Sequence, residues 1–142
     1  MAAGTFVIPD TTKTKLVDGT HDLDTHVFKM ALCTQAQTLA TTSTFGYAGL
    51  TGQVANGNGY TTGGKTVTIS LSRTTGTVTV NCNTQVWTAS TFSAKWAVIY
   101  NDTATNKDIL CYVDLETTVP AGLSPSNGDL TVNTSAGLFT LA

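Results

Sequence analysis

Two neighbouring stretches of the chain alternate strictly between apolar and polar residues, and this period of two constrains the fold more than any other feature. Successive side chains of a β-strand point to opposite faces, so the alternation predicts strands with one apolar and one polar face. A short loop that ends in Gly76 joins residues 65–71 to residues 76–82, which favours a β-hairpin. The apolar positions are Val67, Ile69, Leu71, Val78, Val80 and Cys82.

A second pair of stretches, residues 94–100 and 109–115, is largely apolar at odd and even positions alike. Strands of this kind lie in the centre of a fold and are covered on both faces. The segment between them, residues 101–108, is rich in turn-forming residues. We therefore expect two central strands, with the middle of the core formed by Trp96, Val98, Tyr100, Ile109, Cys111 and Val113.

Shorter runs with strand character cover residues 26–32, 129–133 and 137–141. Strands that recur at roughly ten-residue spacing, separated by turns, are typical of β-sandwiches. No long window has the period of an amphipathic helix. The sequence therefore predicts an all-β fold, a jelly-roll-like two-sheet sandwich of about eight antiparallel strands.

The chain has 142 residues, a length that suits one core. We expect a single β-sandwich domain over residues 19–142, preceded by an extended N-terminal arm over residues 1–18. This arm holds the one apolar cluster that lies outside the strand pattern, followed by proline and a run of threonine and lysine. An extended apolar segment can add to the sheet of a neighbour. The candidate partner-binding residues are therefore Phe6, Val7, Ile8 and Pro9.

The composition is unusual in its shortage of charge. Only 11% of the residues are charged, the net charge is −2, and threonine makes up about a fifth of the chain. The seven basic residues are scattered, whereas a nucleic-acid-binding protein has a basic stripe. Anionic membranes require a similar basic patch, and no apolar run is long enough to span a bilayer. The sequence predicts no nucleic-acid or membrane partner, and the start of the chain, which lacks signal-peptide features, predicts synthesis in a cytosol.

Residues 59–66 match the phosphate-binding loop pattern G-x-x-x-x-G-K-[ST]. That loop binds phosphate only where it follows a buried strand and begins a helix, whose N-terminal amides hold the anion. Here an irregular segment precedes the motif, and the alternating run from Lys65 predicts a strand after it. We interpret the motif as a glycine turn that leads into a strand, without a nucleotide.

The cysteines and histidines do not form a recognisable site. Cys33, Cys82 and Cys111 are odd in number and widely spaced, which fits neither a disulfide framework nor a zinc site. Cys82 and Cys111 fall among apolar strand positions and are predicted to be small core residues. His21 and His26 are five residues apart, which differs from the i, i+4 spacing of a helical zinc site.

Carboxylates near the ends of the two central strands leave two alternatives open, a glycosidase pair and a cation site. A glycosidase requires two carboxylates at a defined separation in a cleft, and aspartate is common in turns for its local hydrogen bonds. We therefore predict that the protein is not an enzyme and that it has no catalytic residues, no metal ligands and no cofactor. The residues concerned are Asp102, Asp108, Asp114 and Glu116, together with the acidic group Asp18, Asp22 and Asp24.

Several short motifs, in this order and spacing, resemble a family of small virion proteins of tailed bacteriophages. The nearest functional class is the capsid cement, or decoration, protein. The resemblance extends from about residue 19 to the end of the chain. Its motifs are His21-Asp22-Leu23, Phe28-Lys29-Met30-Ala31-Leu32, the glycine-rich residues 57–64, Trp87-Thr88-Ala89, and residues 97–104 with the sequence AVIYNDTA.

The resemblance implies a jelly-roll or sandwich module that binds the outer surface of the assembled major-capsid shell and stabilises it. Its partners would be the major capsid protein and other copies of itself, as a dimer or a trimer. The protein would be made in the cytoplasm of a host bacterium and act on the exterior of the capsid. The family offers no catalytic residues to transfer. A tail or fibre module that recognises a glycan or protein of the host surface is the alternative.

Overall fold

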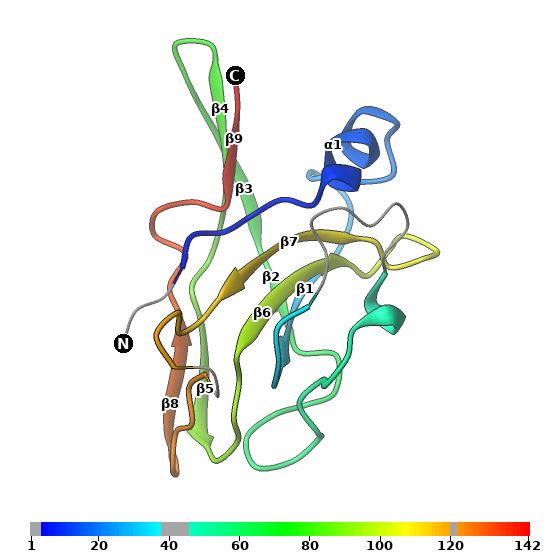
Figure 1. Ribbon diagram of the computed structural model, residues 1–142. Helices are drawn as coiled ribbons and strands as arrows, with labels where there is room; N and C mark the ends of the chain where they lie inside the picture. Colours follow the sequence, from blue (N-terminus) through cyan, green and yellow to red (C-terminus); the bar gives the residue numbers. More distant parts are fainter. Residues whose placement is uncertain (1–3, 38–45, 120–121) are drawn as a thin grey trace.

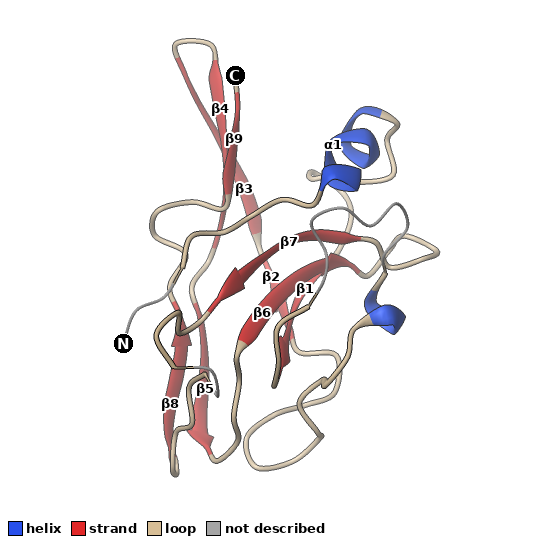
Figure 2. Cartoon of the chain, viewed as in Figure 1, coloured by secondary structure: helices blue, strands red, loops and turns tan. Residues whose placement is uncertain are grey.

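The computed structural model describes residues 4–37, 46–119 and 122–142. These residues form nine strands, one α-helix and one short 3₁₀ helix (Figures 1 and 2). In chain order the elements are α1 (Asp10–Val17), β1 (Phe28–Cys33), η1 (Tyr47–Gly49), β2 (Lys65–Val67), β3 (Ile69–Thr74), β4 (Thr77–Cys82), β5 (Gln85–Ser90), β6 (Trp96–Asn101), β7 (Ile109–Asp114), β8 (Gly128–Val132) and β9 (Phe139–Leu141).

The strands form three antiparallel sheets. Four of them, in the order β2-β1-β6-β7, form what we call the body sheet. Three, in the order β3-β4-β9, form a sheet that extends away from the body in Figure 1, and we call it the projecting sheet. The third sheet contains β5 and β8. The predicted all-β fold is confirmed, whereas the jelly-roll arrangement stays a prediction.

The main core lies between the body sheet and the strands β4, β5 and β8. One face of β1, β6 and β7 meets Val80, Trp87 and Leu130 in a single apolar cluster. The opposite face of the same three strands packs against Tyr47 and Leu50, which lie in and next to η1. Strands β6 and β7 are therefore covered on both faces, as their sequences predicted.

The residues that were predicted to form a single core centre lie on both faces of the body sheet. Cys111 and Val113 face the main core, whereas Val98, Tyr100 and Ile109 belong to the cluster on the opposite face. Trp96 is only half-buried, at the edge of that second cluster. Because odd and even positions of these strands are both apolar, the sequence could not show which set faces the main core. A register shift between β6 and β7 also changes which of the odd or even residues of β7 lie on each face.

The alternating run of residues 65–71 is divided between two sheets. β2 pairs with β1 in the body sheet, and β3 pairs with β4 in the projecting sheet. Thr68 lies at the transition, where its main-chain N–H donates to Asn83 Oδ1 at 2.8 Å and its carbonyl accepts from Asn83 N–H at 3.3 Å. The predicted hairpin is therefore β3–β4, and the strand period continues across the change of sheet.

Strand β5 was not among the predicted strands. Its buried positions include the polar residues Gln85 and Ser90, and Ala89 has a φ of 50°, so the apolar alternation is broken. The two final strands were predicted on either side of a turn, and they do flank it. They do not pair with each other, because β8 pairs with β5 and β9 with β4.

Residues 10–17 form α1 instead of continuing the extended arm predicted for residues 1–18. The helix has no apolar stripe that a period of 3.6 would reveal. It is held by Thr12, whose buried hydroxyl lies 3.1 Å from the carbonyl oxygen of Ile109 and 2.9 Å from that of Leu110. Asp10 in its first turn suits the positive end of the helix dipole. Tertiary contacts, not intrinsic periodicity, determine this helix.

Candidate functional site

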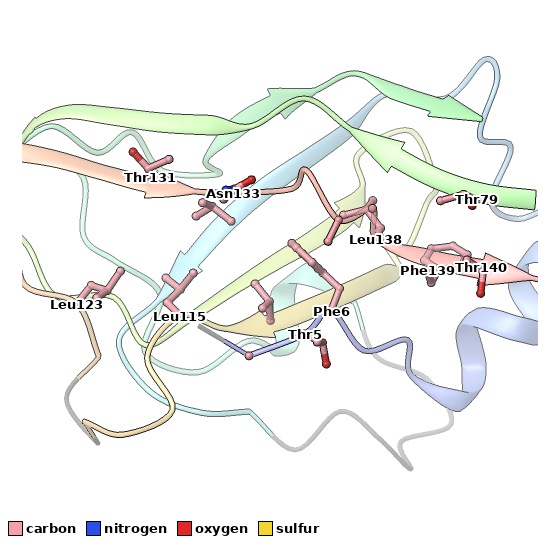
Figure 3. Close-up of a pocket in the computed structure, with 15 residues that line it drawn as sticks. Thr5, Phe6, Thr79, Leu115, Leu123, Thr131, Asn133, Leu138, Phe139 and Thr140 are labelled. Carbon is pink, nitrogen blue, oxygen red and sulfur yellow. The ribbon is translucent and has the colours of Figure 1, made fainter. Parts of the chain in front are cut away.

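A groove with a volume of about 310 Å³ opens between the N-terminal segment, residues 4–9, and the strands β7, β8 and β9. Figure 3 shows Phe6, Leu115 and Leu138 among the side chains that line it. Threonine and asparagine are its polar members, and none of the fifteen described residues that line it carries a charge. The lining residues are Gly4, Thr5, Phe6, Thr79, Val113, Leu115, Leu123, Thr131, Val132, Asn133, Ala136, Gly137, Leu138, Phe139 and Thr140.

The structure places the four candidate partner-binding residues in the N-terminal segment, beside strand β7. Phe6 and Ile8 are half-buried against the main core, and Phe6 also lines the groove. Val7 exchanges main-chain hydrogen bonds of 2.8 and 3.0 Å with Tyr112 of β7, and its side chain is 43% exposed. Pro9 is buried at the start of α1. The segment thus extends the ladder of β7 within its own chain.

Most of the groove could not be found by reading the sequence. Its apolar residues come from the N-terminal segment, the end of β7 and Leu115, Leu123, the end of β8, and residues 136–139. Leu123 stands alone among glycine, serine and alanine, whereas Leu138 belongs to the strand run of residues 137–141, so no single pattern groups the two. The cluster around Phe6 and the strand runs that contain Val113 and Leu138 were each apparent in the sequence, but only the fold brings them together.

The glycine-rich loop leads into strand β2, as predicted, and no helix follows it. Gly64 has a φ of 79°, and a Cβ there would lie 1.8 Å from the carbonyl oxygen of Met30, so only glycine lets the loop reach β1. Lys65 donates to the carbonyl of Val86, and its Nζ lies 5.5 Å from the ring centre of Trp87. The motif therefore joins the body sheet to β5.

The two histidines meet at Asn101, which is fully buried at the end of β6. Asn101 Nδ2 lies 3.3 Å from His21 Nδ1, 2.9 Å from His26 Nδ1 and 3.0 Å from the carbonyl oxygen of Thr20. Asn101 Oδ1 accepts the N–H groups of Thr103 and Ala104. Burial lowers the pKa of His21, which favours its neutral form. The cluster ties the 20–26 turn to the β6–β7 loop.

Six of the seven carboxylates that left open a glycosidase or a cation site have local partners. Asp102 pairs with Lys107 and, at 3.2 Å, with Lys29; the hydrogen bond from Lys107 lowers the pKa of Asp102 most. Asp114 lies 3.0 Å from the Nζ of the buried Lys95. Asp18, Asp22 and Glu116 accept hydrogen bonds from nearby threonine N–H groups, and Asp108 accepts one from the side-chain amide of Asn106.

The three cysteines are buried and free, as predicted for Cys82 and Cys111. Burial raises the pKa of Cys33 to about 12 and that of Cys82 to about 11, and it raises the pKa of Cys111 well above its ordinary value. A thiol with a raised pKa is a poor nucleophile at neutral pH, since the thiolate is the reactive form. These cysteines act as small apolar core residues.

Within residues 4–37, 46–119 and 122–142, no three His, Cys, Asp or Glu side chains come together in a way that could hold a metal ion. The helices in this part of the chain are too short and polar to cross a bilayer. Comparisons of the chain with family models, curated proteins and solved structures found no match. The groove, which the fold builds from separate segments, is therefore the candidate functional site.

Proposed function

We propose that this protein is a structural component of a tailed-bacteriophage particle, a cement protein that binds the outer surface of the major-capsid shell and stabilises it. The observation that carries the proposal is the groove: an open apolar hollow with a neutral polar rim. Such a surface suits an extended, neutral segment of another protein, because apolar contacts form without the cost of desolvating a charge.

The chemistry of the groove disfavours charged small ligands. Thr5, Thr131 and Thr140 are exposed residues of its lining, and they offer hydroxyl groups for hydrogen bonds to a main chain. No lysine or arginine is among the lining residues to hold a phosphate or carboxylate. Attachment through such a surface should depend little on salt, because screening acts on charges.

The second line of support for the proposal is the set of short sequence motifs, in their order along the chain, that resemble those of small virion proteins. The glycine loop and Trp87, which belong to the motifs that resemble those of small virion proteins, contact each other through Lys65. Those motifs hold together the body sheet and β5, so they support the scaffold of such a protein. The groove residues lie largely outside them, which suits a surface that varies with its partner.

The test uses phage particles that lack this protein, to which the purified chain is added. Thr131→Lys and Thr140→Lys each place a charge in the groove at an exposed position, so the fold should keep its stability to within about 0.5 kcal/mol. Burial of an unpaired charge at the interface should weaken attachment by roughly tenfold or more. Occupancy is measured by electron microscopy, and stabilisation by the temperature at which the particles release their DNA.

Thr88→Lys is the matched control, because Thr88 is exposed on β5 and does not line the groove. It should decorate particles as the unchanged chain does. If the groove variants decorate equally well, the groove is not the attachment surface. The number of copies per particle tests the class of protein: hundreds are expected for cement, whereas a few copies at the tail would favour the tail or fibre module.

A further inference from the structure

We propose that two copies of this chain associate through the free edge of strand β3, in antiparallel register about a two-fold axis at Leu71. The two projecting sheets would then form one continuous sheet with the strand order β9-β4-β3-β3-β4-β9. The inference concerns self-association and stands independently of the groove and of the proposed function. It rests on the direction of the main-chain groups, the exposure of β3 and the position of its one charge.

The turn between β3 and β4 determines which main-chain groups of β3 point outward. Thr75 and Gly76 have φ values of 47° and 80°, as in a two-residue type I′ turn. The residues that flank such a turn, Thr74 and Thr77, exchange hydrogen bonds, and bonded and non-bonded pairs alternate from there along the ladder. The residues of β3 whose N–H and C=O groups point away from β4 are therefore Ile69, Leu71 and Arg73.

A hydrogen bond on the other side of β4 gives the same result. Val80 is the partner of Leu71 in the ladder, and its carbonyl accepts the N–H of Leu138 at 2.7 Å, on the side of β9. The main-chain groups of a non-bonded pair point away from each other. Those of Leu71 must then point to the outer edge of β3, where the sheet ends.

Apart from the charge of Arg73, the edge of β3 lacks the features that protect edge strands. Such strands usually carry proline, lysine or a bulge that prevents pairing with another chain. β3 has none of these, and its register with β4 has no shift. Five of its six residues are exposed, and the side chain of Leu71 is 53% exposed. An edge of this kind, next to an exposed apolar side chain, is suited to pairing.

A second copy of the chain suits this edge, because antiparallel pairing centred on Leu71 places the exposed apolar side chain of Leu71 against that of its twin. A two-fold axis there pairs Leu71 with its twin and Ile69 with Arg73 of the other copy. Arg73 is the one charged residue of the projecting sheet. In this register the two arginines lie four residues apart, about 13 Å along the strands, which exceeds the screening length of about 10 Å in 0.1 M salt. The charges therefore permit the pairing.

The experiment measures the oligomeric state of the full chain by sedimentation over a wide range of concentrations. The unchanged protein should dimerise. Leu71→Lys places two like charges opposite each other at the axis and should raise the dissociation constant by roughly tenfold or more. Leu141→Lys is the matched control: Leu141 lies on the same face, on the opposite edge strand β9, and is 41% exposed. This variant should dimerise as the unchanged chain does.

A mixture of two variants tests the register itself. Leu71→Lys and Leu71→Glu should each be largely monomeric, but their equal mixture should regain the dimer, because position 71 faces position 71 across the axis. Circular dichroism confirms that each variant is folded. The proposal is overturned if the unchanged chain stays monomeric, if Leu141→Lys disrupts the dimer as strongly as Leu71→Lys, or if the mixture stays monomeric.

Discussion

The body sheet and the projecting sheet contain the same kind of antiparallel ladder, but they differ in what covers them. In the body sheet, all residues of β7 except Asp114 are buried, and those of β6 except Trp96. In the projecting sheet, β3 is exposed from Ser70 to Thr74. Strands β6 and β7 of the body sheet are stabilised by packing on both faces. The projecting sheet is stabilised by its main-chain hydrogen bonds and by the part of β4 that packs in the main core.

The difference indicates that, in a chain with few charges, one set of residues stabilises the fold and another set provides surfaces for contact with other proteins. The apolar residues at both parities of β6 and β7 supply the core, which is the largest favourable term in folding. The threonine-rich strands supply neutral polar surfaces, which remain soluble and can still approach another protein with little desolvation cost. The predictions below test whether this division holds.

The largest effect is expected in the core, at Trp87. Trp87 lies on β5 and is 1% exposed in the main core, so Trp87→Ala should lower the free energy of unfolding by about 3–5 kcal/mol. Trp96→Ala should cost less, because Trp96 is half-buried and stacks on Tyr112, at a centroid distance of 4.4 Å, at the rim of the second cluster. Urea unfolding of the two variants measures the difference.

A variant in the projecting sheet serves as the contrast. Leu141→Ala removes an exposed side chain and should change the free energy of unfolding by only about 0.5 kcal/mol. If it destabilised the protein as much as Trp87→Ala, the projecting sheet would belong to the cooperative core, and the division between the two sheets would be wrong.

A smaller effect should come from pH, through His21 at the edge of the body sheet. Burial lowers its pKa below the ordinary 6.5, opposed by the hydrogen bond to the carbonyl of Ile109 and by nearby Asp108. The unfolded chain therefore binds a proton where the folded chain does not, so stability should fall as the pH falls below about 6.5. Asp102, whose pKa is lowered from 3.8, contributes a loss only at more acidic pH.

The measurement is the urea midpoint from neutral pH down to about pH 5, a range in which histidine is the side chain that ordinarily titrates. His21→Gln removes the titrating group, keeps a polar side chain, and should flatten the profile in this range. A profile that keeps its slope in the variant would show that another group causes the loss.

The outline of the fold was predictable because period-two patterns depend on local sequence. The hairpin β3–β4 and the pair β6–β7 followed from alternation and from apolar runs. What could not be predicted depends on distant contacts: α1 is held by a threonine that reaches Ile109, and Trp96 lies on the face away from the main core. The groove collects residues from segments far apart in sequence, and no local pattern relates these segments to one another.

The smallest effect on the global free energy of unfolding should come from Thr75 in the turn of the projecting hairpin, because its effect should be local. A β-branched residue is strained at a φ of 47°, whereas asparagine is favoured at this position of a type I′ turn. Thr75→Asn should therefore stabilise the hairpin by about 1 kcal/mol, at the lower end of the cost of such backbone strain. Because the tip of the hairpin has few tertiary contacts, it can open without global unfolding. Hydrogen exchange of the Ser72 and Thr79 amides should slow several-fold, while the global urea midpoint changes little.

Thr77→Asn, the same change inside strand β4, should speed that exchange, since asparagine is disfavoured in strands. If Thr75→Asn changed the free energy of global unfolding as much as the free energy of local opening, the hairpin would unfold together with the body sheet. The two sheets would then be one cooperative unit.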